Sequence, residues 1–473
     1  MVKHSSKRQK LANEQLEEVR DGNVEIFAMF MQEYSLYVPF RSLWSAIRDN
    51  KMLIRKFDEL ATNEWWRLKL EDDFFDFYDA VIEPGNTVKD YYLEWISSTT
   101  EIHTQLLAKP WKLMYMVCYG TMNLLSERER VTEEELISFP WFVENFQFFT
   151  AVSGSLICRP NAGIITITSW TSNERIASFR VNLEGADVDN LQCEPIRNGC
   201  FITDDINQVT AFYDIHTKKL TTDFLDETQE ITGKRTCGDL IELDDGGAIL
   251  NVRDNYKVID DPYGRDFHLL NQDYYVVGMT IFQWPQKTIQ IIEEQTDYEL
   301  RKVFGPYNFS NDRFLILFKK QGVFGYSSGI ITEGKMTMKP ISIDVLTDRH
   351  KSFSYGVVFS DSYHVKNLLL ANGKIVKLQS QGSSFHFVTI CGPFMFVKTK
   401  SDRYKCVDLW NTLQEARKEK ITFISTRHCY NCGFLASFEC STCNLPLCSE
   451  NCEREIAKDK TIACGHNTPY STK

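Results

Sequence analysis

Seven of the 14 cysteines of this chain lie between Cys429 and Cys464. They are spaced as Cys429-x2-Cys432, Cys440-x2-Cys443, Cys448-x3-Cys452 and Cys464-Gly465-His466. A two-residue gap lets both thiolates of a pair reach one tetrahedral zinc ion at about 2.3 Å. Seven cysteines and His466 supply ligands for two structural Zn²⁺ ions, and metal binding would drive the folding of so short a segment. Thiolate-rich sites of this kind are closed, so the pattern predicts a binding module rather than catalytic zinc.

The composition is that of a globular chain without a membrane span. Of 473 residues, 43% are hydrophobic and 25% are charged, and no apolar stretch approaches the ~18 residues of a transmembrane helix. The first residues are polar and lack the apolar centre of a signal peptide. We therefore expect an intracellular protein, cytoplasmic or nuclear or both, whose cysteines bind zinc rather than form disulfides. A net charge of −11 argues against nucleic acid as the main partner, and no membrane partner is expected.

The N-terminal region is predicted to be helical after a short tail. Residues 1–19 are expected to be a disordered basic tail, in which Lys3, Lys7, Arg8 and Lys10 fit either a nuclear localisation signal or a solvated segment. Residues 20–140 repeat apolar side chains at helical spacing and predict a helical domain. Within it, residues 70–80 (LEDDFFDFYDA) are acidic and aromatic. They fit either a charged recognition face or, as burial tendencies favour, inward aromatics with solvated carboxylates.

Residues 145–420 change to a strand-like period. Apolar and β-branched runs such as IITIT (164–168) and FLILF (314–318) alternate with turn residues. Asp245-Gly246 and Asn372-Gly373 fit tight hairpin turns, whose central residues take positive φ. Breaks divide the region into six or seven units of about 40 residues, a period that predicts a β-propeller-like domain. A pair of β-sandwiches is the alternative. The predicted units start near residues 146, 185, 233, 271, 309, 351 and 384.

Two segments of the β region resemble the ends of WD-type repeats. They are FYDIHTK (212–218) and CVDLWNT (406–412), and in each a strand leads into an aspartate, an apolar residue and a polar turn. The β region departs from that family in lacking its GH and WD dipeptides.

Residues 438–452 (FECSTCNLPLCSENC) resemble the core of MYND-type and HIT-type zinc fingers. The similarity covers about 40 residues of a predicted finger at 426–470. It implies that ligands alternate between two Zn²⁺ ions, with one set formed by Cys429, Cys432, Cys448 and Cys452, and the other by Cys440, Cys443, Cys464 and His466. Both families end in His-x3-Cys, whereas this chain ends in Cys464-Gly465-His466. His428 is therefore kept as an alternative ligand for the second ion. Both families act mainly as protein-interaction modules.

Three segments of the helical region resemble F-box-like proteins. They are FRSLW (40–44), WWRLKLEDDF (65–74) and PWKLMY (110–115), although the Leu-Pro opening of a standard F-box is missing. The resemblance implies that this region docks on a cullin-ligase adaptor. The alternative is a helical domain that packs against the β region.

No motif of the chain predicts an enzyme. GYSSG (325–329) matches the G-x-S-x-G pattern, but strand-like residues flank it on both sides, so a hairpin turn is expected rather than a strand-to-helix turn. GKRT (233–236) lacks the preceding glycine of a phosphate loop.

The sequence therefore predicts a multidomain protein, with a helical F-box-like domain, a β-propeller-like domain and a small two-zinc finger. We expect a non-enzymatic protein-interaction adaptor whose partners are other proteins. One version is the substrate-recognition subunit of a cullin-type ubiquitin ligase, which brings a target close to a partner enzyme. The alternatives are a scaffold or transcriptional cofactor without a ubiquitin role, an enzyme of unknown type acting in the propeller channel, or an RNA-associated assembly factor.

Overall fold

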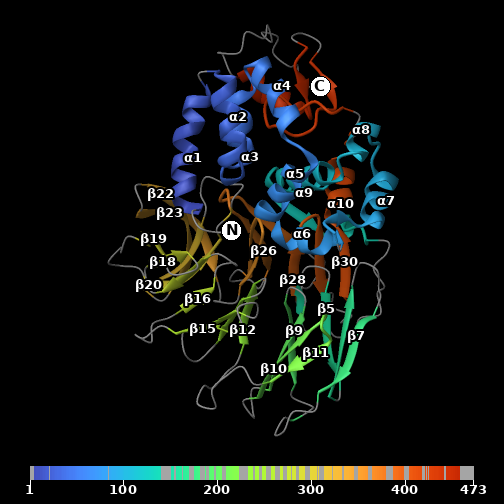
Figure 1. Ribbon diagram of the computed structural model, residues 1–473, viewed down its shortest axis with the longest axis vertical. Helices are drawn as coiled ribbons and strands as arrows, with labels where there is room; N and C mark the ends of the chain where they lie inside the picture. The colour runs from blue at the N-terminus through green and yellow to red at the C-terminus, as the bar shows by residue number, and fades with distance from the viewer. Residues whose placement is uncertain are drawn as a thin grey trace. The chain divides into compact units, whose positions relative to one another are not determined.

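The computed structural model describes residues 5–139 except 21 and 84, the strands and part of the connecting turns between 151 and 408, and residues 409–417, 421, 423, 425–440 and 444–458. The chain forms two units (Figure 1). The helical–cysteine unit comprises Met1–Phe75, Ile82–Glu127 and Leu409–Lys473. The β unit comprises Asp76–Val81 and Arg128–Asp408. The C-terminal cysteine segment thus belongs to the same unit as the N-terminal helices.

The helices of the first unit begin at capping residues that the sequence supplies. The side chain of Asn23 accepts hydrogen bonds at the start of α2, Asn50 does so for α4 and Thr62 for α5, while Pro110 opens α9. The elements of the unit are α1 (Ser5–Arg20), α2 (Val24–Glu33), η1 (Ser35–Tyr37), α3 (Phe40–Ile47), α4 (Lys51–Leu60), α5 (Asn63–Asp73), β1 (Ile82–Glu83), β2 (Thr87–Val88), α7 (Asp90–Thr99), α8 (Thr104–Leu107), α9 (Pro110–Ser126), α10 (Leu409–Arg417), β31 (Phe438–Glu439), β32 (Pro446–Leu447) and α11 (Glu450–Lys458).

The expected disordered tail at residues 1–19 is wrong for most of its length. Helix α1 covers Ser5–Arg20 and buries Ala12, Leu16 and Val19. These residues follow one another by four and three positions, so they share one face of the helix. That face packs against α2 and α3, which explains why a polar and basic segment is ordered.

Helix α9 is the centre of the helical–cysteine unit, because every residue from Trp111 to Thr121 is buried. The segments that carry the F-box-like resemblance meet around it. The ring of Phe40 on α3 lies 5.4 Å from that of Trp66 on α5 and 5.8 Å from that of Tyr115 on α9. Their aromatic side chains therefore form a shared core.

Two carboxylates of the acidic stretch 70–80, those of Asp73 and Asp76, are neither part of a charged recognition face nor simply solvated. Asp73 is buried, accepts a hydrogen bond from Lys69 Nζ at 2.8 Å, and accepts another from the Tyr115 hydroxyl at 2.7 Å. Asp76 lies on α6 (Phe75–Val81) and accepts hydrogen bonds from the Ser354 hydroxyl at 2.6 Å and the Ser354 N–H at 3.1 Å. Lys69 precedes Asp73 by four residues on α5, but Tyr115 and Ser354 lie on distant elements, so sequence proximity could not reveal these two partners.

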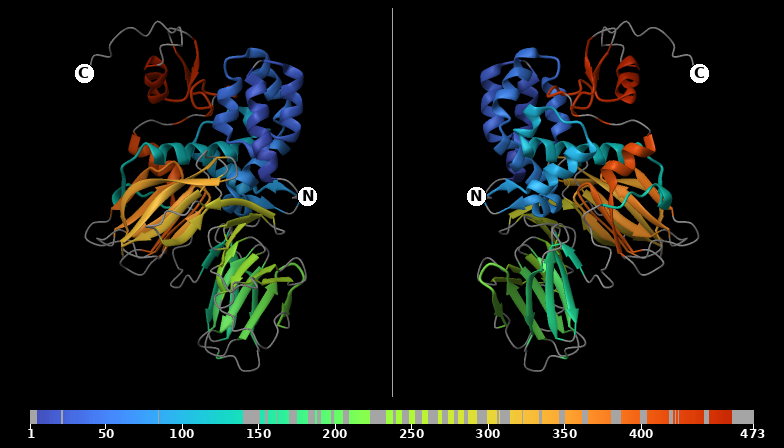
Figure 2. Two further views of the ribbon diagram at one scale, coloured as in Figure 1. Left: turned by 90° about the vertical axis from the view of Figure 1, so that its left-hand side faces the viewer. Right: turned by 90° about the vertical axis from the view of Figure 1, so that its right-hand side faces the viewer.

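The β unit consists mainly of small antiparallel sheets in chain order, coloured from green to orange in Figure 2. The first sheets contain β4 (Ala151–Ser153), β5 (Leu156–Asn161), β6 (Ile164–Ser169) and β7 (Arg175–Arg180), then β8 (Gln192–Ile196), β9 (Gly199–Asp204), β10 (Val209–Asp214) and β11 (Lys219–Thr221), then β12 (Gly233–Cys237), β13 (Leu240–Leu243), β14 (Ala248–Asn251) and β15 (Lys257–Asp260).

Two further groups of four strands are joined edge to edge by a short parallel pairing of β19 with β23. They are β16 (Phe267–Leu269), β17 (Tyr274–Val277), β18 (Thr280–Gln283) and β19 (Lys287–Ile292), and β20 (Glu299–Phe304), β21 (Phe314–Lys320), β22 (Val323–Thr332) and β23 (Lys335–Val345). The last groups are β24 (Lys351–Phe353), β25 (Gly356–Ser360), β26 (Lys366–Leu370) and β27 (Ile375–Gln379), then β28 (Phe387–Cys391), β29 (Phe394–Lys398) and β30 (Tyr404–Asp408).

Residues that precede β4 in the chain pair with strands of the last two sheets of the β unit. Strand β3 (Arg130–Thr132) pairs in parallel with β27. The N–H of Phe139 then donates to Cys406 O at 2.8 Å, and the N–H of Asp408 donates to Ile137 O at 2.8 Å. Residues 137–139 therefore add a fourth edge segment beside β30.

Neighbouring sheets of the β unit share apolar cores. One core joins β5 and β6 to β8, β9 and β10 through residues that include Cys158, Ile167, Cys200 and Ile202. Another joins β20, β21 and β22 to β25 and β26. Several first strands also lie beside the first strand of the next group, since β8 contacts β4 and β5, β12 contacts β8, β16 contacts β12, and β28 contacts β24.

Local sequence predictions in the β unit had mixed outcomes. Asn372-Gly373 lies in the turn between β26 and β27, as predicted, but positive φ is found only at Gly373 (+81°) and not at Asn372. Asp245-Gly246 lies outside the described residues. The predicted hairpin turn at GYSSG is wrong, because Gly325–Gly329 lies inside β22 and pairs with both β21 and β23. Helix α10 lies within the predicted β domain but packs on α9. No helix of the described chain is long and apolar enough to cross a bilayer.

Candidate metal centre

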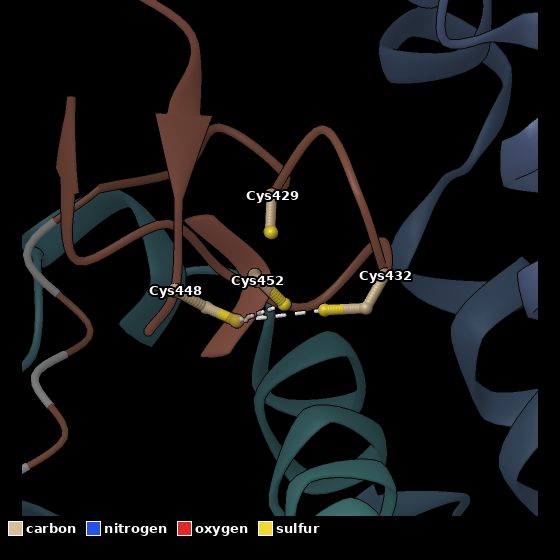
Figure 3. Close-up of side chains that lie close together, drawn as sticks. All are labelled: Cys429, Cys432, Cys448 and Cys452. Carbon is tan, nitrogen blue, oxygen red and sulfur yellow. Dashed lines mark hydrogen bonds between the residues drawn. The ribbon is translucent and has the colours of Figure 1, made fainter. Parts of the chain in front are cut away.

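Four cysteine sulfurs converge in the C-terminal segment (Figure 3). Cys429 and Cys432 lie on the turn before β31, Cys448 follows β32, and Cys452 lies on α11. The four sulfurs all lie within 4.8 Å of one another, and Cys448 Sγ is 3.5 Å from both Cys432 Sγ and Cys452 Sγ. The structure therefore brings together the four cysteines that the finger resemblance assigned to one ion.

The geometry of this cluster fits a tetrahedral metal. Zinc–sulfur bonds of about 2.3 Å place thiolates about 3.8 Å apart around one ion, which lies within the observed range of separations. Four thiolates are the ligand set of closed structural zinc sites. The sequence also builds the local frame, since Cys429 and Cys452 pack with Leu447 and Ile456 in one apolar cluster.

Contacts among the thiols separate their pKa values. Hydrogen bonds with the other thiols lower the pKa of Cys429 and of Cys452, while those contacts raise the pKa of Cys432 and of Cys448. Metal ligation requires thiolates, so a bound cation would have to displace the protons that Cys432 and Cys448 hold in the metal-free cluster.

Most of the second ligand set lies outside the described residues. Cys443, Cys464 and His466 are among them, so their prediction as ligands remains a prediction. Cys440 is described and buried, but its sulfur does not belong to the four-cysteine cluster.

His428, the alternative ligand, is part of the aromatic core. Its Nδ1–H donates to Gly433 O at 2.7 Å, and its ring centroid lies 5.0 Å from that of Trp44 and 5.7 Å from that of Phe40. Burial and the nearby positive charge of Lys112 hold the pKa of His428 well below its usual value. His428 therefore has a neutral packing role here and does not join the cysteine cluster.

Side chains of α3, of the residue that ends it and of α9 bind the turn from Cys429 to Cys432. Trp44 Nε1–H donates to Tyr430 O at 3.2 Å, Arg48 donates to Tyr430 O at 3.3 Å and to Asn431 O at 3.2 Å, and the Tyr119 hydroxyl donates to Cys432 O at 2.8 Å. The Arg48 guanidinium also lies 4.9 Å from the centre of the Tyr430 ring. No pattern of spacing in the sequence marked these contacts.

Close packing surrounds this fastened turn. Gly433 has φ +80°, and a Cβ there would come within 2.9 Å of Trp44 Cγ, so only glycine fits between turn and helix. Behind it, a Cβ on Gly120 would come within 2.7 Å of Trp410 and 2.8 Å of Phe434. The C-terminal part of the unit thus packs closely on both α3 and α9.

A cavity of about 130 Å³ opens beside the cysteines. Its wall includes the thiol residues Cys432, Cys448 and Cys452, the end of α9 at Ser126 and Glu127, and Arg41 of α3. The cavity therefore borders one side of the cluster.

No family model and no curated protein matches this sequence. Among solved structures, the chain is similar to the dihydro-heme d1 dehydrogenase NirN in complex with DHE, with a TM-score of 0.35 and 11% identity over 59% of this chain and 69% of that chain. It is similar to PorZ of Porphyromonas gingivalis, with a TM-score of 0.36 and 9% identity over 53% of this chain and 35% of that one. The N-terminal domain of Nup159 gives a TM-score of 0.32 and 9% identity over 58% of this chain and 91% of that one. Likenesses this low carry no argument about function.

Proposed function

We propose that this chain is a non-enzymatic protein-interaction adaptor with a structural zinc centre. The observation that carries the proposal is the convergence of Cys429, Cys432, Cys448 and Cys452. Four thiolates leave no open coordination position for substrate or water, so the metal would have a structural role. The cysteine segment would then complete the helical–cysteine unit, as a MYND-type or HIT-type finger would.

The β unit is proposed to be a seven-bladed propeller that presents a surface to a protein partner. Seven successive groups of strands support this, and so do the contacts between the first strands of the first four groups (β4, β8, β12 and β16) and between β24 and β28. The pairing of residues 137–139 with β30 supports it further. In a ring of sheets, an N-terminal segment that completes the last sheet would join the first and last blades.

The cullin-ligase version of the proposal rests on the helical unit. Its support is that segments 40–44, 65–74 and 110–115 meet in one core. The face of α3 that carries Trp44 is occupied by the cysteine turn, so an adaptor would have to bind elsewhere. Met29 on α2 and Met52 on α4 are 61% and 69% exposed, and α2 packs against α4. These two methionines are suitable positions for interface variants.

Metal analysis of the purified full-length chain tests the zinc proposal. One equivalent of zinc that is lost in Cys448→Ser/Cys452→Ser would support it, and two equivalents would extend it to the set of Cys440, Cys443, Cys464 and His466. A folded wild-type chain with no bound metal would refute it.

Titration with a purified cullin-ligase adaptor protein tests the ubiquitin version separately. Binding that is weakened by Met29→Glu/Met52→Glu, but not by Met29→Leu/Met52→Leu, would support it. Absence of binding to the folded, zinc-loaded chain would reject it in favour of a scaffold without a ubiquitin role.

A further inference from the structure

The carbonyl groups of the cysteine turn point toward the helices. Three consecutive carbonyl oxygens accept hydrogen bonds from helix side chains. Trp44 on α3 donates to Tyr430 O, Arg48 at the end of α3 donates to Asn431 O, and Tyr119 on α9 donates to Cys432 O. The donors are fixed in turn, because Trp44 is buried in the unit's core and Tyr119 is also buried. The helices therefore determine the orientation of each peptide group in this turn.

Peptide geometry connects this orientation to the metal. In a planar trans peptide, the C=O and the N–H of the next residue point in opposite directions. The carbonyl groups of Tyr430 and Asn431 face the helices. The N–H groups of Asn431 and Cys432 therefore point away from the helices. Outer partners of this kind orient metal ligands and tune the strength with which they bind.

The flanks of the turn are fixed as well. The N–H of Gly433 donates to Cys429 O at 2.9 Å, and the N–H of Tyr430 donates to Pro446 O at 2.8 Å. On the helix side, Lys112 Nζ lies 5.6 Å from the Trp66 ring and donates to Thr426 O at 3.5 Å. The turn is thus held on both sides by contacts that do not involve a metal.

We propose that Trp44, Arg48 and Tyr119 are positioning residues of the metal centre. They hold the Cys429–Cys432 turn in its ligating conformation before metal arrives, and so they set the metal affinity of the site. By linkage, bound metal stabilises the helices that carry them. This inference rests on the proposed zinc centre and adds that the N-terminal helices form its outer shell.

The expected size of the effect follows from the behaviour of such outer partners. Their removal usually lowers metal affinity by about 10- to 100-fold. Arg48→Met should show the largest loss, since it removes a charged donor from two carbonyls. Tyr119→Phe should show a smaller loss, since it removes one hydroxyl and leaves the ring in place.

Competition for zinc between the full-length chain and a chromophoric chelator tests the proposal. The variants are Arg48→Met, Arg48→Lys, Trp44→Phe and Tyr119→Phe. The matched control is Trp65→Phe, because Trp65 Nε1–H donates to Ser35 Oγ at 2.8 Å inside the same helical bundle. Thermal unfolding is followed in parallel, and the absorption of the Co²⁺-loaded protein reports the geometry of the sulfur ligands.

We expect Arg48→Met and Tyr119→Phe to release zinc more readily and to alter the Co²⁺ spectrum, with partial recovery in Arg48→Lys. Trp65→Phe should lower the unfolding temperature without changing the affinity of the folded protein. If Trp44→Phe does not fold, Tyr119→Phe still decides the question. Wild-type zinc affinity in both Tyr119→Phe and Arg48→Met would overturn the positioning role but would not contradict the zinc site. A wild-type chain that binds no zinc would contradict the zinc site itself.

Discussion

The β unit and the helical–cysteine unit are held together by contacts of very different range in the sequence. In the β unit, most strands pair with the strand next to them in the chain, as β8 to β11 do. In the helical–cysteine unit, Trp44 bonds to Tyr430, and Tyr119 bonds to Cys432. The β unit can therefore gain structure one sheet at a time, whereas the helical–cysteine unit needs both ends of the described chain together.

Both units bury charged side chains. The helical–cysteine unit buries the ion pair of Lys69 and Asp73, and the β unit buries the carboxyl groups of Asp204 and Asp408. The helical–cysteine unit also gathers four cysteines in one cluster. Removing one partner of a buried ion pair leaves a costly unpaired charge, so loss of Lys69 should strongly destabilise the helical–cysteine unit.

Loss of the metal ligands should have the largest effect and should fall on one unit. For Cys448→Ser/Cys452→Ser, we expect the helical–cysteine unit to lose several kcal/mol, with about 10–16 kcal/mol as the upper bound from zinc-finger peptides. Calorimetry of the full chain should show this unit's transition at a much lower temperature and the β-unit transition nearly unchanged. Cys200→Ser is the control that should do the reverse. Equal shifts in both transitions would break the distinction between the units.

Removal of one partner of the buried ion pair should have the next largest effect. Lys69 Nζ also donates to Leu36 O at 3.1 Å and to Val38 O at 3.0 Å. Lys69→Met should therefore cost about 3–5 kcal/mol, since Asp73 keeps its charge in a buried place. Denaturant unfolding followed by the helical circular dichroism signal measures this cost.

Asp72→Asn is the matched control for that pair. The Asp72 carboxylate lies 3.9 Å from Lys69 Nζ, but its side chain is 35% exposed. Its loss should cost about 0–1 kcal/mol, as for surface pairs. A cost similar to that of Lys69→Met would show that burial does not separate these contacts.

A smaller effect is expected in the β unit and depends on pH. Burial raises the pKa of Asp76 to about 6, against opposing hydrogen bonds from Ser354. A raised carboxyl pKa means that the folded state holds this proton more tightly than the unfolded state. Stability should therefore be greatest below about pH 4 and should fall by up to about 3 kcal/mol as pH rises to about 6. Asp76→Asn should flatten this part of the β-unit profile.

Ser354→Ala sharpens the same prediction. The Ser354 hydroxyl lowers the Asp76 pKa by hydrogen bonding, so its removal should move the pH window upward. A calorimetric profile in which Asp76→Asn and wild type lose the same stability between pH 4 and 7 would contradict the assignment.

The sequence predicted those features that are local or periodic. The spacing of Cys429, Cys432, Cys448 and Cys452, read with the finger resemblance, identified the observed cluster. Turn and strand patterns placed breaks close to the first strands of the sheets. Predicted starts at 233 and 351 coincide with β12 and β24, and the largest offset is at 309, where β20 begins at Glu299.

What the sequence could not predict depends on distant partners. Ala12, Leu16 and Val19 are buried in a segment whose composition is that of a solvated tail. His428 resembles a ligand beside a cysteine, but the rings of Trp44, Phe40 and Trp66 surround it. Trp44, Arg48 and Tyr119 face a turn more than 300 positions away, and no spacing rule connects them.

The split composition of the helical–cysteine unit has a consequence for biosynthesis. Its helices up to Glu127 leave the ribosome first, but Leu409 and the residues after it follow only once Arg128–Asp408 has been made. At about 5–20 residues per second, that interval is roughly 15–60 s. During it, Gly120 and Tyr119 lack the covering side chain of Phe434 and the acceptor at Cys432. A nascent chain stalled in this interval would display bare aromatic surface, which makes it a client for molecular chaperones.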